Sequence, residues 1–266
     1  YNVTKGWLKA GGLPEATVND LAIDAKDKCT IYAAIGNRLY QSLDCTRTWR
    51  EVYFDNNPGI QVSAVAVDHY NNRNLYIGTS RGDIIKSSDQ GSSWKTIQRL
   101  DDGVRKLVIS PSDSRTIFAA SAKNGLYRFN ANSFVNLDDL ENYKNRFDGT
   151  NWTDLNSELR EFNLGINFKN LVVSPSDSSL FLATDKMILK SMDGGRSWAK
   201  LKLITPEKDT VINDIAVNPK DSSEIYYVSD TAFFRSSDGG NTWTSKQLVT
   251  SRSGSSLLID FNNPNI

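Results

Sequence analysis

Short apolar stretches alternate with polar turns along nearly the whole chain. In Val62–Val67 apolar and small residues precede Asp68, and a second apolar run follows the next polar turn at Leu75–Ile77. The same order returns later in the chain, where one apolar stretch begins at Ile212 and a second follows the next polar turn at Ile225. Short runs of this kind, bounded by Gly, Asn, Asp and Ser, are typical of β-strands, and they lack the 3.6-residue period of a helix. The pattern predicts an all-β protein and argues against a helical solenoid.

The tryptophans recur at one phase of this pattern. They are Trp7, Trp49, Trp94, Trp152, Trp198 and Trp243. Most steps are about 45 residues long, and each interval contains four short strands, here called A to D, with D beginning at the tryptophan. Four strands in one such interval make one blade of a β-propeller.

Four of these tryptophans close a shared motif in the turn between strands C and D. Each copy has a Ser, an Asp two residues later and a tryptophan at its end. The copies are Ser42, Asp44 and Trp49; Ser87, Asp89 and Trp94; Ser191, Asp193 and Trp198; and Ser236, Asp238 and Trp243. Short Ser and Asp side chains can bond to backbone N–H groups in tight turns, and a tryptophan can anchor the turn by burying its ring. We expect these residues to stabilise their own turns and to take no part in chemistry.

On these motifs the chain resembles the Asp-box, or bacterial neuraminidase repeat, β-propellers over nearly its whole length. That group includes sialidases, xyloglucan-cleaving glycoside hydrolases, sortilin receptors and photosystem II assembly-factor propellers. The resemblance implies the fold, and function has to be argued from the site.

The strand pattern gives five complete blades. Strand A begins near Val18, Val62, Val104, Phe168, Ile212 and Ser255. An orphan D strand is expected at Trp7 and an orphan A strand at 256–260. We interpret residues 1–266 as a single β-propeller domain, cut from a parent of six or seven blades. An insertion at about 129–151, with a helical turn expected at 137–143, is either a contact loop or tolerated drift.

Composition argues against nucleic-acid partners, membrane helices and metal sites. Lys plus Arg and Asp plus Glu both number 31, so the chain lacks the basic excess typical of nucleic-acid binding. No apolar stretch approaches the length of about 18 residues that a membrane helix needs. The cysteines and the single histidine show no metal-ligand spacing, and no metal or cofactor is expected.

Catalytic signatures of the related enzymes do not transfer to this chain. Sialidases need an arginine cluster, a Tyr nucleophile with a Glu partner and a Phe/Tyr-Arg-Ile-Pro segment, and that segment is absent. The xyloglucan-cleaving relatives use a carboxylate pair in a cleft between two propellers. His69 lies in a polar turn and is interpreted as a surface residue. A carboxylate pair assembled across blades stays open.

Two functions are therefore carried forward. The first is a non-enzymatic binding or assembly scaffold that presents propeller loops to a protein or peptide partner. The alternative is a carbohydrate-binding protein or a fragment of an Asp-box glycoside hydrolase.

The starts of the innermost strands, at the mouth of the central channel, are the predicted binding site. The residues are Asn19, Asp20, Ser63, Arg105, Lys106, Lys169, Asn170, Asn213 and Asp214. Basic residues in the third and fourth blades and acidic residues in the first and fifth suit a zwitterionic or peptide-like ligand. Of the two basic residue types, arginine suits a carboxylate better, because its guanidinium group can donate two parallel hydrogen bonds. The alternative is that these are solvated strand ends.

The two cysteines are predicted to form a disulfide. Alignment on the second blade puts Cys29 in the A-to-B turn opposite Arg73, and Cys45 in the C-to-D turn opposite Gln90. The two turns leave the same end of one blade, although two free thiols are the alternative. Because structural disulfides persist outside the reducing cytoplasm, the pair predicts a secreted, periplasmic or surface-anchored protein.

Overall fold

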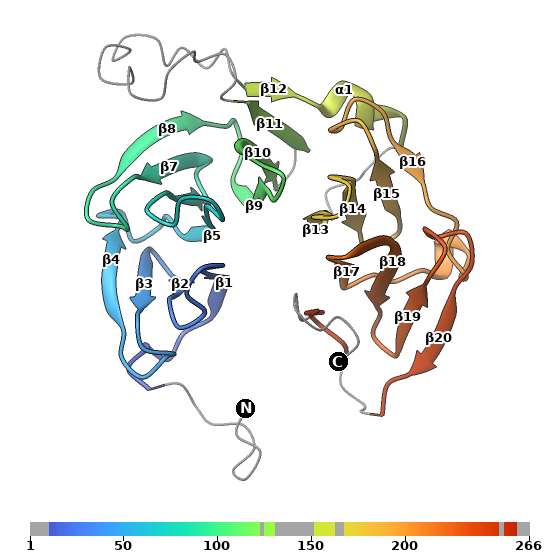
Figure 1. Cartoon of the computed structure of the whole chain (residues 1–266), viewed down its shortest axis with the longest axis horizontal. Helices are drawn as coiled ribbons and strands as arrows, with labels where there is room; N and C mark the ends of the chain where they lie inside the picture. Colours follow the sequence, from blue (N-terminus) through green and yellow to red (C-terminus); the bar gives the residue numbers. More distant parts are fainter. Residues whose placement is uncertain (1–10, 123–124, 131–151, 163–167, 250–252, 260–266) are drawn as a thin grey trace. The chain divides into compact units, whose positions relative to one another are not determined.

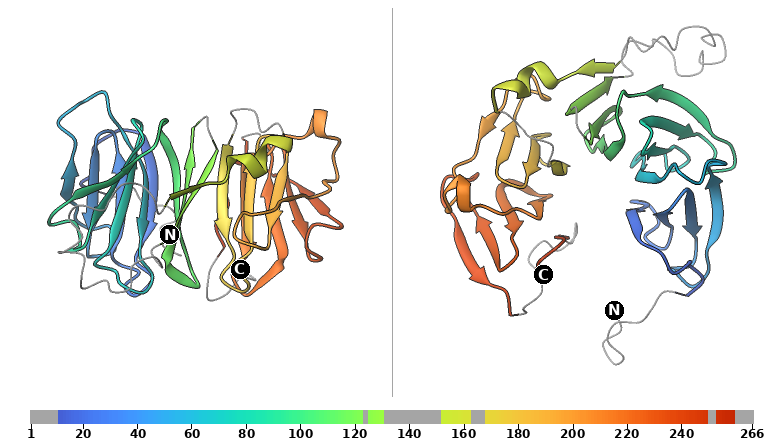
Figure 2. Two further views of the ribbon diagram at one scale, coloured as in Figure 1. Left: turned by 90° about the horizontal axis from the view of Figure 1, so that it is seen from above. Right: turned by 180° about the vertical axis from the view of Figure 1, so that it is seen from behind.

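The strands assemble into four-stranded antiparallel sheets, each in chain order (Figures 1 and 2). The structure is a computed structural model that describes residues 11–122, 125–130, 152–162, 168–249 and 253–259. The described residues form five such sheets. The all-β propeller fold with five complete blades is confirmed.

The chain forms two compact units, and the described residues up to Ile109 belong to the first. Its first blade consists of β1 (Val18–Ile23), β2 (Ile31–Ile35), β3 (Arg38–Ser42) and β4 (Arg50–Phe54). Its second blade consists of β5 (Val62–Val67), β6 (Leu75–Thr79), β7 (Asp83–Ser87) and β8 (Lys95–Arg99). The third sheet begins with β9 (Val104–Ser110), where the two units meet along the chain.

The second unit holds the rest of the third sheet and two further blades. The third sheet continues with β10 (Asp113–Ser121), β11 (Leu126–Asn130) and β12 (Trp152–Asp154). The fourth blade consists of β13 (Phe168–Val173), β14 (Leu180–Thr184), β15 (Ile188–Ser191) and β16 (Ala199–Lys200). The fifth consists of β17 (Asp214–Asn218), β18 (Asp221–Val228), β19 (Ala232–Ser236) and β20 (Thr244–Gln247). The prediction of one domain over residues 1–266 stays a prediction.

Apolar side chains fill the space between neighbouring blades within each unit. In the first unit Tyr32 and Leu39 share a buried cluster with Val65 and Leu75 of the next blade. In the second unit an equivalent cluster joins Phe181 and Ile188 to residues of the fifth blade, among them Ile215 and Tyr227. Strands such as β6 and β14 are buried at every position, and successive side chains of a strand point to opposite faces. Both faces of these strands are therefore covered, and each blade needs a neighbour to cover it.

Four C-to-D turns of the described residues, those of the first, second, fourth and fifth blades, are organised by their Ser and Asp. In the fourth blade Asp193 Oδ1 accepts hydrogen bonds from Ser191 Oγ at 2.8 Å and Ser197 N at 2.9 Å, and Oδ2 accepts one from Ser197 Oγ at 2.6 Å. Ser191 Oγ in turn accepts a bond from Gly195 N at 2.8 Å. The same contacts recur around Asp44, Asp89 and Asp238. These bonds lower the pKa of all four carboxyl groups from 3.8 to about 2, with the Ser or Thr hydroxyl before the tryptophan as the largest cause.

Two of the tryptophans that follow these turns bond to the preceding blade. Trp94 Nε1 donates to the Val52 carbonyl at 2.7 Å, and Trp243 Nε1 donates to the Lys202 carbonyl at 2.9 Å. Both carbonyls belong to the outer edge of the blade before. Each of Trp49, Trp94, Trp198 and Trp243 immediately precedes its outer strand, and Trp152 is the first residue of β12. The predicted phase of the tryptophans is therefore confirmed, whereas Trp7 lies outside the described residues.

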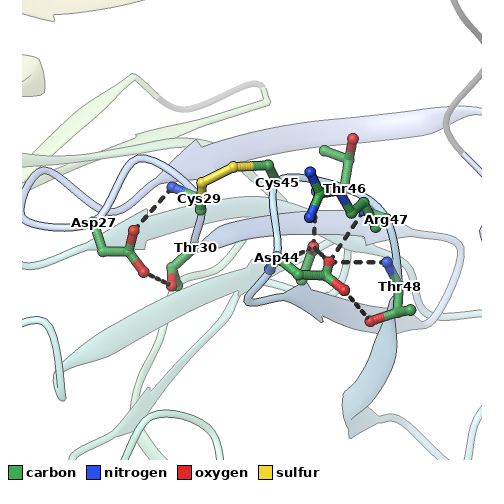
Figure 3. The surroundings of a disulfide bond; sticks show 9 residues. Asp27, Cys29, Thr30, Asp44, Cys45, Thr46, Arg47 and Thr48 are labelled. Atoms are coloured by element: carbon green, nitrogen blue, oxygen red, sulfur yellow. Dashed lines mark hydrogen bonds between the residues drawn. A yellow bond between two sulfur atoms is a disulfide. The ribbon is translucent and has the colours of Figure 1, made fainter.

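A disulfide joins Cys29 and Cys45, as predicted (Figure 3). The Cys45 N–H also donates to the Cys29 carbonyl at 3.1 Å. In the second blade Gln90 N and the Arg73 carbonyl form the same backbone bond, so the alignment of the two blades was correct. The covalent bond thus reinforces a contact between turns that another blade makes by hydrogen bonding alone.

The first blade has a conformational reason to need this reinforcement. Its C-to-D turn places Cys45 at φ 57° and Thr46 at φ 70°, where the fourth blade has Gly194 and Gly195. The left-handed region costs a non-glycine residue roughly 1–2 kcal/mol. A disulfide closing a loop of about 16 residues contributes roughly 3 kcal/mol in the chain-entropy model, which offsets that cost.

Three local features differ from the sequence expectations or were missed. Strand β17 begins at Asp214 and not at Ile212, because the Ile212 N–H donates to the Asp185 carbonyl of the preceding blade. Residues 253–259 form no strand, since no described strand pairs with them. A short helix, α1 (Asn156–Leu159), follows β12 and continues into the 3₁₀ turn η3 (Arg160–Phe162). Of the insertion expected at about 129–151, residues 129 and 130 end β11, and residues 131 to 151, including the expected helical turn, lie outside the described residues.

Removal of the disulfide tests its contribution to stability. We expect a C29S/C45S variant to unfold roughly 5–10 °C lower, since about 3 kcal/mol is lost in a chain of this size. A C29S/C45G variant should regain part of that loss, because glycine tolerates the positive φ at position 45. Thermal unfolding followed by circular dichroism measures both, and two reactive thiols in the unfolded, unreduced wild type would contradict the bond.

The Asp residues of the C-to-D turns should make stability sensitive to acid. Their pKa is lowered in the folded protein, so their contribution is present above pH 3.8 and is lost as the pH falls toward about 2. We expect Asp193→Ala to lower the midpoint of thermal unfolding at pH 7 and to flatten its decline between about pH 4 and 2. Scanning calorimetry across that range checks both. Loss of ligand binding without loss of stability would instead assign Asp193 a functional role.

Candidate functional site

The predicted binding residues lie at the end of the blades where the B-to-C hairpins and the D-to-A loops meet. Leu100 N donates to the Gly82 carbonyl at 2.9 Å, and Leu248 N donates to the Thr231 carbonyl at 2.8 Å. Each bond joins a D-to-A loop to a hairpin of the same blade. We call this end the strand-start end, because the innermost strands begin there, and we call the opposite end the turn end.

The second residue of an innermost strand bonds to the first position of the next one. Asn19 Nδ2 donates to the Val62 carbonyl at 2.9 Å, and Ser63 Oγ donates to the Val104 carbonyl at 2.5 Å. In the second unit Asn213, the residue before β17, donates from Nδ2 to the Gly254 carbonyl at 2.8 Å, although residues 253–259 form no strand. Asn19 and Ser63 therefore join successive inner strands, and Asn213 makes the corresponding bond to a segment without a strand ladder.

Two aspartates make a second set of these links, Asp20 at the third position of β1 and Asp214 at the first position of β17. Asp20 Oδ2 accepts a bond from Val65 N at 3.0 Å, and Asp214 Oδ2 accepts one from Leu257 N at 2.8 Å. Val65 and Leu257 follow Val62 and Gly254 by three residues, so the pattern repeats in register. The bond from Leu257 shows that residues 253–259 lie where an inner strand would, although they form no ladder.

Two further predicted residues supply the amide or ammonium partner of an aspartate. Lys106 Nζ forms a 3.0 Å ion pair with Asp20 Oδ1. Asn170 Nδ2 donates to Asp214 Oδ1 at 2.7 Å. The structure thus brings Asn19, Asp20, Ser63 and Lys106 together in the first unit, and Asn170, Asn213 and Asp214 in the second.

Arg105 and Lys169 are the predicted residues with free cationic groups. Both occupy the second position of an innermost strand, in β9 and β13, and both are exposed. Neither forms a hydrogen bond or ion pair with the described part of the chain. Lys169 nevertheless interacts electrostatically with Asp230. The pKa of Asp230 is lowered chiefly by the hydrogen bond from the Asn213 amide and then by one from Ser253, and the charge of Lys169 lowers it further.

A buried carboxylate in the second blade was missed by sequence reasoning. Asp83 is buried at the start of β7, and its carboxylate pairs with Arg99 Nε at 2.5 Å and Arg81 Nε at 2.6 Å. Burial raises the pKa of Asp83, but the hydrogen bonds from Arg99 and Arg81 outweigh it and leave the pKa lowered. Asp83 follows a Ser-Arg-Gly turn that gives no signal of burial, so only the spatial arrangement identifies it.

Carboxyl groups in the described ranges whose pKa departs clearly from the ordinary value all have it lowered. They are Asp44, Asp83, Asp89, Asp113, Asp177, Asp193, Asp221, Glu224, Asp230 and Asp238.

His69 is exposed in the turn after β5, as expected. Among the described residues, no three His, Cys, Asp or Glu side chains gather as a metal site would require. In the same residues no helix has the length and apolar character needed to cross a membrane.

The link through Asp20 can be tested at one amide. We expect Asp20→Ala to speed the hydrogen exchange of the Val65 amide and to cost about 1–3 kcal/mol of stability, because the Lys106 ion pair is lost as well. Asn213→Ala, which removes a link in the second unit, should leave Val65 exchange unchanged. Amide exchange followed by NMR decides, and unchanged Val65 exchange in Asp20→Ala would contradict the link.

Comparisons with known proteins give the fold. No protein-family model matches the sequence, and no curated protein matches it. Among solved structures, the GH74 xyloglucanase from Xanthomonas campestris matches with 15% identity and a TM-score of 0.69, over 93% of this chain and 43% of its own. The GH74 enzyme of Niastella koreensis matches with 19% identity and a TM-score of 0.63, over 86% of this chain and 38% of its own.

A third solved structure, described as YCF48 bound to D1 peptide, has 17% identity and a TM-score of 0.47, over 87% of this chain and 82% of its own. The chain spans about two fifths of the length of the two GH74 enzymes. At these identities the matches to the GH74 enzymes show that the chain has the blade architecture of a β-propeller, and they show the fold alone.

Proposed function

We propose that this protein is a non-enzymatic binding or assembly scaffold whose strand-start end presents loops to a protein or peptide partner. The observation that carries the proposal is the pair of exposed cations Arg105 and Lys169, one on each unit, neither of which forms a hydrogen bond or ion pair with the described residues. Most polar neighbours of these cations are used to link inner strands. Arg105 and Lys169 make no such link between strands, and an exposed guanidinium or ammonium group suits a carboxylate of a partner.

The hydrogen bonds to the acidic residues support a binding role over a hydrolytic one. A glycoside hydrolase needs a carboxylic acid with a raised pKa to protonate the leaving oxygen. Where the pKa of a described carboxyl group is clearly shifted, hydrogen bonds to its charged form lower it. Such groups are held as anions and are poor proton donors at neutral pH.

The disulfide supports a location outside the cytoplasm. Cys29 and Cys45 are joined in a turn region of one blade. Bonds of this kind persist in secreted, periplasmic and surface proteins and are rare where thiols are kept reduced. We therefore propose that the partner is met in an extracytoplasmic compartment.

The alternative function is carbohydrate binding, or a part in an Asp-box glycoside hydrolase. It is favoured by the names of two matched structures, which are GH74 enzymes, although the likeness to them extends to the fold alone. A panel of xyloglucan oligosaccharides in a calorimetric screen separates the two functions. Binding or turnover of an oligosaccharide in the absence of peptide binding would favour the alternative.

Charge reversal at the free cations tests the scaffold proposal. Peptides are selected from a phage-displayed random library on the immobilised protein, and their affinity is measured for the variants Arg105→Glu and Lys169→Glu. We expect at least one of these changes to weaken binding about tenfold or more, since a charge-assisted hydrogen bond is lost and a repulsion is added. Lys106 is left intact because its substitution would also break the ion pair with Asp20.

The matched controls are Arg47→Glu and Arg196→Glu, two exposed arginines of the C-to-D turns at the turn end. They carry the same change of net charge, so a general electrostatic effect would weaken binding in all four variants alike. Equal sensitivity of the two ends, or failure to select any peptide, would overturn the proposal.

A further inference from the structure

Two arginines converge on one buried carboxylate at the strand-start end of the second blade. Asp83 lies opposite Arg99 in the ladder of β7 and β8, and Arg81 precedes Asp83 by two residues in the B-to-C hairpin. Asp83 Oδ1 pairs with Arg99 Nε at 2.5 Å, and Oδ2 pairs with Arg81 Nε at 2.6 Å. The Asp83 side chain is 1% exposed, whereas those of Arg81 and Arg99 are 46% and 60% exposed. The buried carboxylate therefore holds two guanidinium groups that reach into solvent.

The outer nitrogens of both guanidinium groups are unused. Each arginine bonds to Asp83 through Nε alone, and the Nη nitrogens of Arg81 and Arg99 form no hydrogen bond or ion pair with the described residues. Asp101 and Asp102, in the loop directly after Arg99, form no ion pair with either arginine. Because a guanidinium group presents its N–H donors in a fixed, planar fork, two such forks remain open for a ligand.

The cluster holds more positive charge than the burial of one carboxylate requires. In the fifth blade the buried Glu224 is matched by a single arginine, Arg235, which bonds to it through both Nε and Nη2. Asp83 has two arginines and uses one nitrogen of each. One carboxylate balances one guanidinium group, so one positive charge remains in excess.

Asp55, in the loop after β4 of the first blade, also acts on Arg81. The pKa of Arg81 is raised chiefly by the hydrogen bond with Asp83, and the charge of Asp55 raises it further. The Asp55 carboxylate accepts a hydrogen bond from Asn57 N at 2.8 Å and one from the Tyr53 hydroxyl at 3.5 Å, and it forms no ion pair with Arg81. Asp55 thus attracts Arg81 without occupying its fork.

The backbone keeps the two arginines together. Leu100 N, directly after Arg99, donates to the carbonyl of Gly82, directly after Arg81, at 2.9 Å. Gly82 has a φ of +100°, and a Cβ at this position would collide with the Leu100 carbonyl oxygen, so the hairpin and the loop are in direct contact. Groups that are fixed before binding lose less conformational freedom when a ligand binds. The two guanidinium groups are therefore preorganised.

We propose that Arg81 and Arg99 form a clamp for a carboxylate of the partner peptide. The proposal rests on the scaffold function and names one anchoring contact of it. The Nη groups donate charge-assisted hydrogen bonds to the carboxylate oxygens, while Asp83 holds both guanidinium groups from the buried side. The single excess positive charge favours a singly charged, planar carboxylate over a doubly charged sulfate or phosphate.

Three capped amino acids of nearly equal size are the probes. N-acetylglutamic acid α-amide carries a side-chain carboxylate, N-acetylglutamine carries a terminal carboxylate, and N-acetylglutamine amide carries neither. Each is titrated into the protein while the Nε–H signals of Arg81 and Arg99 are followed by NMR. We expect saturable shifts with one or both carboxylates and none with the neutral amide, and the tighter carboxylate identifies an acidic side chain or a chain end as the ligand. Equal shifts with the neutral amide, or tighter binding of inorganic sulfate, would overturn the carboxylate class.

Arg99→Gln and Arg99→Lys separate the clamp from simple charge attraction. Both variants leave Asp83 paired with Arg81, so we expect thermal unfolding close to that of the wild type. Glutamine removes the charge, and lysine retains it without the planar fork. Binding of the carboxylate probe should weaken about tenfold or more in Arg99→Gln and at least about threefold in Arg99→Lys. Wild-type affinity in Arg99→Lys would reduce the clamp to general electrostatic attraction.

Arg115→Gln is the matched control. The Arg115 side chain is 54% exposed and pairs through Nε with Asp113 at 2.9 Å, so this variant loses the same charge and the same kind of ion pair. Arg115 lies near the start of β10, at the turn end. Affinity for the carboxylate probe should change less than about twofold, and an effect as large as that of Arg99→Gln would contradict the clamp.

The outcomes distinguish the clamp from the scaffold function. Selected peptides that bind Arg99→Gln as tightly as the wild type would overturn the clamp and leave the scaffold function standing. Binding of the carboxylate probe at Arg81 and Arg99, when no peptide can be selected, would overturn the scaffold function and leave a site for small carboxylates.

Discussion

The dependence of each blade on its neighbour is the constraint on which the structure rests. An inner strand with apolar side chains on both faces cannot be covered by the outer strands of its own sheet. Within each unit the cover comes from the adjoining blade, through clusters such as the one that joins Tyr32 to Val65. The polar groups at the edges follow the same rule, since Trp94 donates to Val52 and Asn19 to Val62 of an adjacent blade.

This constraint decides which residues are available for function. Asn and Asp side chains at the strand starts are bound to the next inner strand or, in the second unit, to residues 254 and 257 that lie in its place, so their polarity is structural in the first instance. The residues that the blades do not use stand out against this background. They are Arg105 and Lys169, whose cationic groups form no hydrogen bond or ion pair with the described residues. A polar strand start is weak evidence for a ligand, whereas an unused charge is stronger evidence.

The sequence was sufficient wherever the chemistry is local and repeated. The phase of the tryptophans located the outer strands, and the alignment of Cys29 with Arg73 predicted a contact that the second blade makes with a backbone bond. It was insufficient where a partner lies one blade away. The bond between Asp20 and Val65 spans 45 residues and depends on how two sheets pack, which no spacing within one repeat encodes.

The central claim is that the strand-start end binds the partner and that the turn end maintains the blades. Hydrogen exchange measured by mass spectrometry, with and without a selected peptide, tests this claim over the whole molecule in one measurement. The account predicts slower exchange in the D-to-A loops and B-to-C hairpins, including 205–211 and 229–231, with unchanged exchange in C-to-D turns such as 89–93. Protection confined to the C-to-D turns would contradict it.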